Sequence, residues 1–323
     1  MLWRYRNHEF PEVYTPKKFC YAIGTRETDF RRVSSMKSLH YKKEQKLKSD
    51  GIRYRDIYKP DYELKSILKR INRKYLSKLN FPPFVHCGPK GRSIITATRG
   101  HNRFRYHLSL DIDSFFDRVS MAAVSGALNR IGIVRKVTET VISACVEDNR
   151  LPQGFPTSPL LSALVLSCSL EGFYVEAIRG EVLLSIYADD ILVSANSTQL
   201  LNEAKEFIEN KIGSIGLSLN PVKEQFGEMG KKFSWLGLNI HPWASIPREK
   251  LLSLQKEVYE YKLTGEIPVG FKPKKRGNPK KLWRKSVKGK VVFARSINKN
   301  KLVSKTLRTL RMPRRKVTRN LVP

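Results

Sequence analysis

The most informative hydrophobic pattern lies around residues 182–193. Apolar, β-rich runs at 182–186 and 191–193 flank the polar sequence Tyr187-Ala188-Asp189-Asp190. This pattern predicts a strand–turn–strand hairpin with two adjacent carboxylates at its tip. Two uncompensated carboxylates between apolar neighbours would be costly, so one prediction is a divalent cation held by oxygen ligands. The alternative is a hairpin turn in which the Asp-Asp pair only caps the bend.

A second apolar run, Leu108-Ser109-Leu110, leads directly into Asp111, and residues 114–116 look like the turn into a helix. A carboxylate at a strand end, followed by a backbone turn, can offer a metal both a side-chain oxygen and a neighbouring main-chain carbonyl, such as that of Ile112. Asp113 and Asp117 are less specific, because either also suits a helix N-terminus.

Helical and strand periodicities account for much of the remaining chain. Residues 62–79 predict an amphipathic helix with a basic outer face, and further helical patterns cover 120–150, 160–174 and 200–212. Residues 51–60 alternate basic and apolar side chains, which predicts a strand presenting Arg53 and Arg55 on one face, or an ordinary solvated strand. The proline- and glycine-containing stretch 151–159 predicts a tightly turned loop. Strands are expected within 216–223 and 233–240, and residues 1–50 read as helical or irregular.

The charge balance points to a polyanionic partner. The 323 residues include 61 Lys and Arg against 29 Asp and Glu, a net charge of +32, which suits nucleic acid or an acidic membrane surface. No run of 18 apolar residues occurs and the first residues lack an apolar signal core, so we expect no membrane span. The four cysteines are widely spaced, which fits a reduced, cytoplasmic setting. Gly-Lys-Ser/Thr is absent from the sequence, which argues against a P-loop ATPase.

The C-terminal region is compositionally distinct. No acidic residue follows Glu266, whereas residues 267–323 contain 20 Lys and Arg. A disordered basic tail is one interpretation. Apolar residues are interleaved throughout, however, and predict a folded, helical domain that grips phosphates. The candidate RNA-binding residues in this region are Lys274, Lys275, Arg276, Lys285 and Lys288.

The acidic positions together indicate a reaction. Asp111 and the Asp189-Asp190 pair each end an apolar strand, and side by side in one sheet they could hold two divalent ions about 3.5–4 Å apart. One ion would activate a 3′-hydroxyl as the nucleophile, and both ions would stabilise the charge that develops as pyrophosphate leaves. Carboxylates suit this task because Mg²⁺ prefers oxygen ligands.

At this point the sequence resembles the reverse transcriptases, in particular the short prokaryotic enzymes of retrons and related defence systems. The resemblance runs from about Tyr54 to Ile240. Three motifs carry it in order: Asp111 with Phe115-Phe116, Gln153-Gly154 with 156–159, and 187–190. It implies an α+β right-hand polymerase fold. The domains would be an N-terminal extension (1–50), fingers (51–107), a palm (108–240, with a fingers-like helical insertion at 120–150) and a basic, mainly helical thumb (241–323).

The resemblance also implies roles at matched positions. Asp111, Asp189 and Asp190 would be catalytic and, with Ile112, would bind two Mg²⁺ ions, for which Mn²⁺ is a potential substitute. Phe116 would exclude a nucleotide 2′-hydroxyl. Nucleotide contacts are expected from Arg55, Gln153, Gly154 and Lys223, and the primer grip from Trp235, Leu236 and Gly237. The implied partners are a structured non-coding RNA template and primer, the RNA/DNA hybrid and dNTPs, in the bacterial cytoplasm. An effector protein or a homo-oligomer is left open.

Two departures from the retron pattern bear on the subtype. The Asn-Ala-x-x-His element is reduced to His101, an expected RNA contact or simply a satisfied loop side chain. The Val-Thr-Gly element keeps only Gly237. A non-retron defence enzyme making repetitive or untemplated DNA therefore stays open. So do an RNA-directed RNA polymerase, a non-catalytic RNA-binding protein and, less well suited to this length, an intron maturase.

Overall fold

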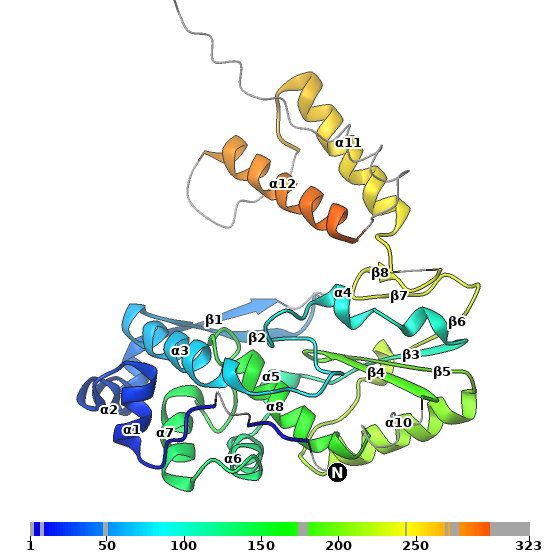
Figure 1. Ribbon diagram of the computed structural model, residues 1–323. Coiled ribbons are helices and arrows are strands. Elements are labelled where there is room, and N and C mark those ends of the chain that lie inside the picture. The colour runs from blue at the N-terminus through cyan, green and yellow to red at the C-terminus, as the bar shows by residue number, and fades with distance from the viewer. Residues whose placement is uncertain are drawn as a thin grey trace, which may run out of the picture. The chain divides into compact units, whose positions relative to one another are not determined.

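The computed structural model (Figure 1) describes residues 3–6, 10–47, 51–173, 180–242, 244–268, 271 and 278–297. The chain divides into two compact units, Met1–Lys231 and Lys232–Pro323. Each unit has its own cluster of buried apolar side chains, so each is described by itself.

A four-stranded antiparallel sheet forms the centre of the first unit. Its strands, in spatial order, are β4 (Val182–Tyr187), β5 (Asp190–Ala195), β3 (Tyr106–Asp111) and β6 (Gln225–Glu228). The predicted hairpin is confirmed, because Tyr187 pairs with Asp190 and only Ala188 and Asp189 separate the two strands. The predicted strand into Asp111 is confirmed as β3.

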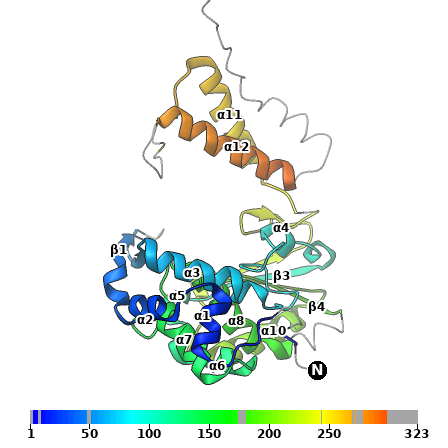
Figure 2. The same cartoon turned by 60° about the vertical axis from the view of Figure 1, so that its left-hand side comes forward.

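The two faces of this sheet differ in character because successive side chains point to opposite sides. One face carries Leu108, Leu110, Ile191 and Val193, which belong to the main apolar core. That face is covered by α8 (Ser158–Ser169) and α10 (Thr198–Gly213), whereas α4 (Ile94–Ala97) lies on the opposite side of the sheet (Figures 1 and 2). The opposite face is polar and carries the carboxylates at one end.

The N-terminal part of the first unit combines helices with a hairpin. Helices α1 (Pro16–Ile23) and α2 (Glu27–Ser35) are followed by the short 3-10 helix η1 (Lys37–His40), strands β1 (Tyr41–Leu47) and β2 (Tyr54–Pro60), helix α3 (Tyr62–Lys74) and the 3-10 helix η2 (Leu76–Lys78). The predicted strand at 51–60 is confirmed as β2. Strand β1 was missed, because its sequence YKKEQKL has no apolar alternation and its side chains are nearly all exposed. Pairing with β2 makes it a strand.

Shorter helices complete the first unit. After α4 come the 3-10 helix η3 (His101–Arg103) and α5 (Phe115–Arg118); the predicted helical stretch 120–150 is two helices, α6 (Met121–Arg130) and α7 (Arg135–Cys145). Gly132, at φ 81°, lies in the break between them. The strand predicted within 216–223 is wrong. That segment is a loop ending in the 3-10 helix η4 (Pro221–Lys223), and only Leu219 forms a bridge, with Ile112.

The second unit contains a small hairpin and two helices. Strands β7 (Ser234–Trp235) and β8 (Leu238–Asn239) precede α11 (Arg248–Thr264) and α12 (Pro279–Ile297). Tyr261 and Trp283 pack at 4.2 Å between ring centroids, and the Trp283 indole donates to Glu257 at 2.8 Å. The helical prediction for this basic region is confirmed where the structure describes it. Among the described helices none has the length and apolar content needed to cross a membrane.

Candidate active site

The carboxylates meet at one end of the sheet because of strand register. In the antiparallel pairing of β3 with β5, Asp111 lies directly opposite Asp190. The Ile112 amide donates to the Asp189 carbonyl at 3.0 Å, so the hairpin tip is tied to the chain just after Asp111. The structure therefore brings Asp111 opposite Asp190, which lies 79 positions later in the sequence.

Left-handed backbone occurs at both turns of this site. Ala188, in the turn between β4 and β5, has φ 60°, and Ser114, in the turn after Asp111, has φ 48°. Side-chain-bearing residues adopt this region at a cost of about 1–2 kcal/mol. The surrounding pairing holds both residues there, as is common where a functional group must be aimed.

Two of the carboxyl groups at this end of the sheet, Asp189 and Asp190, have raised pKa values. Burial first, and then the negative charges of Asp189 and Asp111, raise the pKa of Asp190 to about 7. Burial is also the main reason that the pKa of Asp189 is raised, with the charge of Asp111 adding to it and Lys223 and Arg55 opposing it. Such clustering is typical of a site built to hold additional positive charge.

Lys223 supplies part of that charge. Its ammonium donates to both oxygens of Asp111, at 2.9 and 2.8 Å, from the end of η4. Partial burial works to lower the pKa of Lys223, but the hydrogen bond to Asp111 and the nearby carboxylates outweigh it and leave that pKa raised. The Lys223 side chain is 54% exposed whereas that of Asp111 is 9% exposed, so the lysine approaches the buried carboxylate from the open side.

The donor set has the chemistry of a divalent-cation site. Within the part of the chain that the structure describes, no group of three or more His, Cys, Asp or Glu side chains is placed so that it could hold a metal ion. Asp111, Asp189 and Asp190 nevertheless provide mutually interacting carboxylates, and the Ile112 amide is bonded to the same turn. These carboxylates are hard oxygen donors of the kind that Mg²⁺ and Mn²⁺ prefer. The residues present therefore fit such an ion. In this structure the Lys223 ammonium balances the charge of Asp111.

Two of the expected nucleotide-contacting segments are joined directly. The Tyr58 amide of β2 donates to the Gln153 carbonyl at 2.8 Å. Gly154 has φ 115°, and a Cβ there would lie 2.3 Å from the Tyr58 carbonyl oxygen. Arg55, in the same strand, is close enough to lower the pKa of Asp189. Strand β2 and the loop 151–157 are therefore attached to each other, and Arg55 of this strand lies near Asp189.

Phe116 follows Asp111 through the Ser114 turn and begins α5 with Phe115. The Phe116 ring is half-buried, and its centroid lies 5.3 Å from the ring centroid of Phe115, which is fully in the core. Packing against Phe115 limits the positions that the Phe116 ring can take.

Several other predicted site residues belong to the second unit. Trp235, Leu236 and Gly237 form the β7–β8 turn of the second unit, with Leu236 at φ 51° and Gly237 at φ 76°. Lys285 and Lys288 are exposed on α12. The three remaining basic candidates lie outside the described residues: Lys274, Lys275 and Arg276.

His101 is completely buried, not on an RNA-accessible surface. Its Nδ1 lies 2.7 Å from the Ser194 hydroxyl and its Nε2 lies 2.9 Å from the Ser185 hydroxyl. Sequence reasoning missed these partners. The available signal was the polar residues at alternate positions in otherwise apolar strands, on the same sheet face as Asp111 and Asp190.

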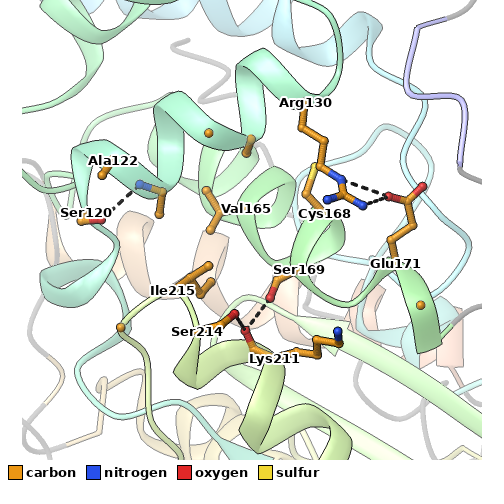
Figure 3. A pocket seen from close by; sticks show the side chains of 15 residues that line it. Ser120, Ala122, Arg130, Val165, Cys168, Ser169, Glu171, Lys211, Ser214 and Ile215 are labelled. Atoms are coloured by element: carbon orange, nitrogen blue, oxygen red, sulfur yellow. Dashed lines mark hydrogen bonds and ion pairs between the residues drawn. The ribbon is translucent and has the colours of Figure 1, made fainter.

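A sizeable cavity of the first unit is separate from the carboxylates. It has a volume of about 1080 Å³ and is lined by α6, α8 and the end of α10 with the residues that follow it. Its walls are mainly small side chains, with an Arg130–Glu171 ion pair of 3.0 Å at one end (Figure 3). None of Asp111, Asp189 or Asp190 lines it.

Comparison with known proteins identifies the family. Residues 42–240 match the family model described as reverse transcriptase (RNA-dependent DNA polymerase). The chain belongs to the reverse transcriptase family. The α+β polymerase fold expected from the sequence is thereby confirmed, and the matched segment contains all three carboxylates.

Among curated proteins, the chain is similar to reverse transcriptases of retrons. It is 30% identical over 210 residues to the Retron Ec86 reverse transcriptase of Escherichia coli, covering 64% of this chain and 65% of that protein. It is 26% identical over 231 residues to the Retron Mx65 reverse transcriptase of Myxococcus xanthus, covering 66% and 54%. The match thus spans less than two thirds of either relative. Apo telomerase from Candida Tropicalis aligns with a TM-score of 0.46 at 13% identity, covering 62% of this chain and 46% of that one, which adds nothing to the family assignment.

Proposed function

We propose that this reverse transcriptase is an RNA-directed DNA polymerase that copies a dedicated, structured non-coding RNA into DNA, in the cytoplasm of a bacterium and within a retron or anti-phage defence system. The observation that carries the proposal is the meeting of Asp111 with Asp189 and Asp190 at one end of the sheet, in a cluster short of positive charge. The family match and the similarity to retron enzymes support it.

Asp111, Asp189, Asp190 and the Ile112 carbonyl would hold two Mg²⁺ ions, with Mn²⁺ as a substitute. When bound, the ions would lower the pKa of the primer 3′-hydroxyl and neutralise charge on the triphosphate. The chain's own residues then have distinct tasks. Arg55 binds the triphosphate, and Lys223, an ammonium held on Asp111, stands ready to donate a proton to the departing pyrophosphate.

Residues around the carboxylates would select and orient the nucleotide. Gln153 and Gly154 line the incoming nucleotide, and their attachment to β2 keeps them in register with Arg55. Phe116, held against Phe115, blocks the space that a 2′-hydroxyl would need. Ordered neighbours matter because misplacing a reacting group by about 1 Å can reduce the rate roughly 100-fold.

The remaining assignments concern nucleic-acid handling. We assign residues 51–107 to the fingers, 108–240 to the palm and 241–323 to the thumb, with Trp235, Leu236 and Gly237 as the primer grip. The exposed Lys285 and Lys288 of α12 bind phosphates of the RNA or of the RNA/DNA hybrid. The net charge of +32 supports such a partner.

Primer extension tests the function. The purified chain should incorporate labelled dNTPs on an RNA template in the presence of Mg²⁺, and Asp189→Asn should abolish incorporation. Asp117→Asn is the matched control, since it removes one charge six residues after Asp111 without touching the cluster, and it should retain activity. Activity that survives Asp189→Asn would refute the role of the carboxylates, and an inactive wild-type chain would favour a non-catalytic RNA-binding protein.

Two further measurements separate the related functions. Phe116→Ala should admit ribonucleotides; if ribonucleotide use is unchanged, Phe116 is not the selecting residue. Sequencing the nucleic acid that co-purifies with the chain identifies the subtype. An RNA joined to DNA through an internal branch marks a retron, whereas repetitive or untemplated DNA marks a different defence enzyme.

A further inference from the structure

A chain of hydrogen bonds crosses the polar face of the sheet beneath the catalytic hairpin. It links six side chains from three parts of the sequence, with consecutive N···O distances of 3.0, 3.4, 2.9, 2.7 and 2.7 Å. In order along the chain they are Thr96, His86, Ser185, His101, Ser194 and His107. Of these, Ser185, His101, Ser194 and His107 are buried, with at most 2% of each exposed.

The central contact joins the two strands of the catalytic hairpin. Ser185 belongs to β4 and Ser194 to β5. Their hydroxyls form hydrogen bonds with the two different nitrogens of the same His101 ring. His101 itself comes from η3, in the segment that follows α4. The ring therefore ties this segment to both strands of the hairpin whose turn carries Asp189 and Asp190.

The bonding at Thr96 sets a direction for the whole chain. The Thr96 hydroxyl donates to the Ser93 carbonyl at 2.8 Å, so its oxygen must accept at its contact with His86 Nδ1. A neutral imidazole has one donor and one acceptor, and a hydroxyl has one hydrogen to donate. Each contact therefore fixes the next one along the chain.

Following these rules, His86 donates through Nδ1 and accepts at Nε2 from Ser185. Ser185 then accepts from His101 Nε2, whose Nδ1 accepts from Ser194, and Ser194 accepts from His107 Nδ1. The rings must be neutral for this pattern. Burial supports that condition, because it lowers the pKa of His101 to about 3 and that of His86 to about 4.

We propose that His101 is a positioning residue for nucleotidyl transfer, clamping β4 to β5 through a one-directional relay of hydrogen bonds so that Asp189 and Asp190 are held in place. The positioning role rests on the proposed polymerase function. The tautomers (Nδ1–H on His86, Nε2–H on His101 and Nδ1–H on His107) belong to the same proposal, but they rest on the hydrogen-bond distances and on neutral rings and not on the polymerase function.

Nitrogen NMR of the ¹⁵N-histidine-labelled full chain tests the relay. The ring ¹⁵N shifts distinguish the tautomers, and His→Gln variants assign the six histidines. We expect the three tautomers given above at neutral pH. The reversed set, with Nε2–H on His86, Nδ1–H on His101 and Nε2–H on His107, or rapid averaging between the two, would overturn the proposed direction.

Paired variants test the positioning role. His101→Phe keeps a ring but removes the hydrogen bonds that His101 makes with the two buried serine hydroxyls. Both the stability and kcat should therefore fall. The triple variant His101→Phe/Ser185→Ala/Ser194→Ala removes the ring and both hydroxyls together, and only the outer nitrogens of His86 and His107 then lose a partner. Its melting temperature should recover part of the loss seen in His101→Phe, whereas its kcat should stay at least tenfold below wild type with the KM for dNTP within twofold.

The outcomes separate the two claims. If the triple variant recovers kcat along with stability, His101 is only a packing residue and the positioning role is wrong. Ser162→Ala, which removes a buried hydroxyl from α8 outside the relay, is the control and should keep wild-type kcat. An inactive wild-type chain would reject the polymerase function and the positioning role with it, whereas the tautomer measurement is independent of activity.

Discussion

The contact between Gly154 and β2 gives a sharp test of how the nucleotide-contacting segments are held together. Gly154→Ala would place a Cβ 2.3 Å from the Tyr58 carbonyl oxygen, at a residue whose φ is 115°. Ordinary contact requires a separation about 1 Å larger. The obstacle is backbone on both sides, so no flexible side chain can move aside.

The expected cost follows from two contributions. A side-chain-bearing residue at this φ costs about 1–3 kcal/mol. Moving the loop by about 1 Å also breaks the 2.8 Å bond from the Tyr58 amide to the Gln153 carbonyl, which contributes about 0.5–1.5 kcal/mol. Gly154→Ala should therefore destabilise the attachment of the loop to β2 by about 2–4 kcal/mol.

Hydrogen exchange of the Tyr58 amide measures this attachment directly. A loss of about 2–4 kcal/mol raises its exchange rate roughly 30- to 1000-fold when opening is local. Because Arg55 lies in the same strand, the KM for dNTP should rise at least tenfold.

Gly91→Ala is the matched control: its φ is 80° but nothing lies within 4 Å of the added Cβ. It should leave Tyr58 exchange and KM unchanged. Wild-type exchange at Tyr58 in Gly154→Ala would refute the reasoning.

Three other predictions follow from the site. Lys223→Met removes the ammonium that competes for Asp111, so Mn²⁺ should bind the protein alone at least threefold more tightly by electron paramagnetic resonance titration while kcat falls; unchanged Mn²⁺ affinity would contradict this competition. Ala188→Gly relieves about 1 kcal/mol of backbone strain at φ 60° but gives the unfolded chain about 0.5–1 kcal/mol more freedom, so urea unfolding should shift by less than 1 kcal/mol while a looser turn lowers kcat. The folded-state pKa of His86, about 4, lies below its unfolded value of about 6.5. As the pH falls, the unfolded state therefore binds the proton first. The stabilisation of the folded state by neutral His86 is complete above pH 6.5 and is lost as the pH falls towards 4. Between pH 6 and 5 the free energy of unfolding of the wild type should therefore fall by about 1.2 kcal/mol more than that of His86→Gln, and parallel slopes would show that His86 is not held neutral.

Local sequence was sufficient for the strand ends and many of the helices. The apolar runs before Asp111 and on both sides of Asp189-Asp190 predicted β3, β4 and β5, because burial of one or both faces leaves a clear periodic record. Helix α3 was predicted for the same reason, although it ends at Lys74 and gives way to a 3-10 turn. Patterns of this kind depend only on neighbours in the chain.

Elements stabilised by distant partners were missed. Strand β1 is charged and exposed, and only pairing with β2 makes it a strand. Conversely, residues 216–223 are of types common in strands. The backbone of this segment instead forms hydrogen bonds with the backbone of Asp111 and Asp113 and then turns into η4. That turn carries Lys223 onto Asp111, a contact that no local pattern contains.

The amino-acid sequence by itself determined the chemistry available to this protein: which carboxylates end apolar strands, how basic the chain is, and which motifs it shares with reverse transcriptases. Only the tertiary structure decided which groups meet. Register places Asp111 opposite Asp190, and burial turned His101 from an expected RNA contact into a link between two strands. The physical reason is that spacing along a chain specifies local periodicity, whereas the partner of a buried polar group is set by packing between segments far apart in sequence.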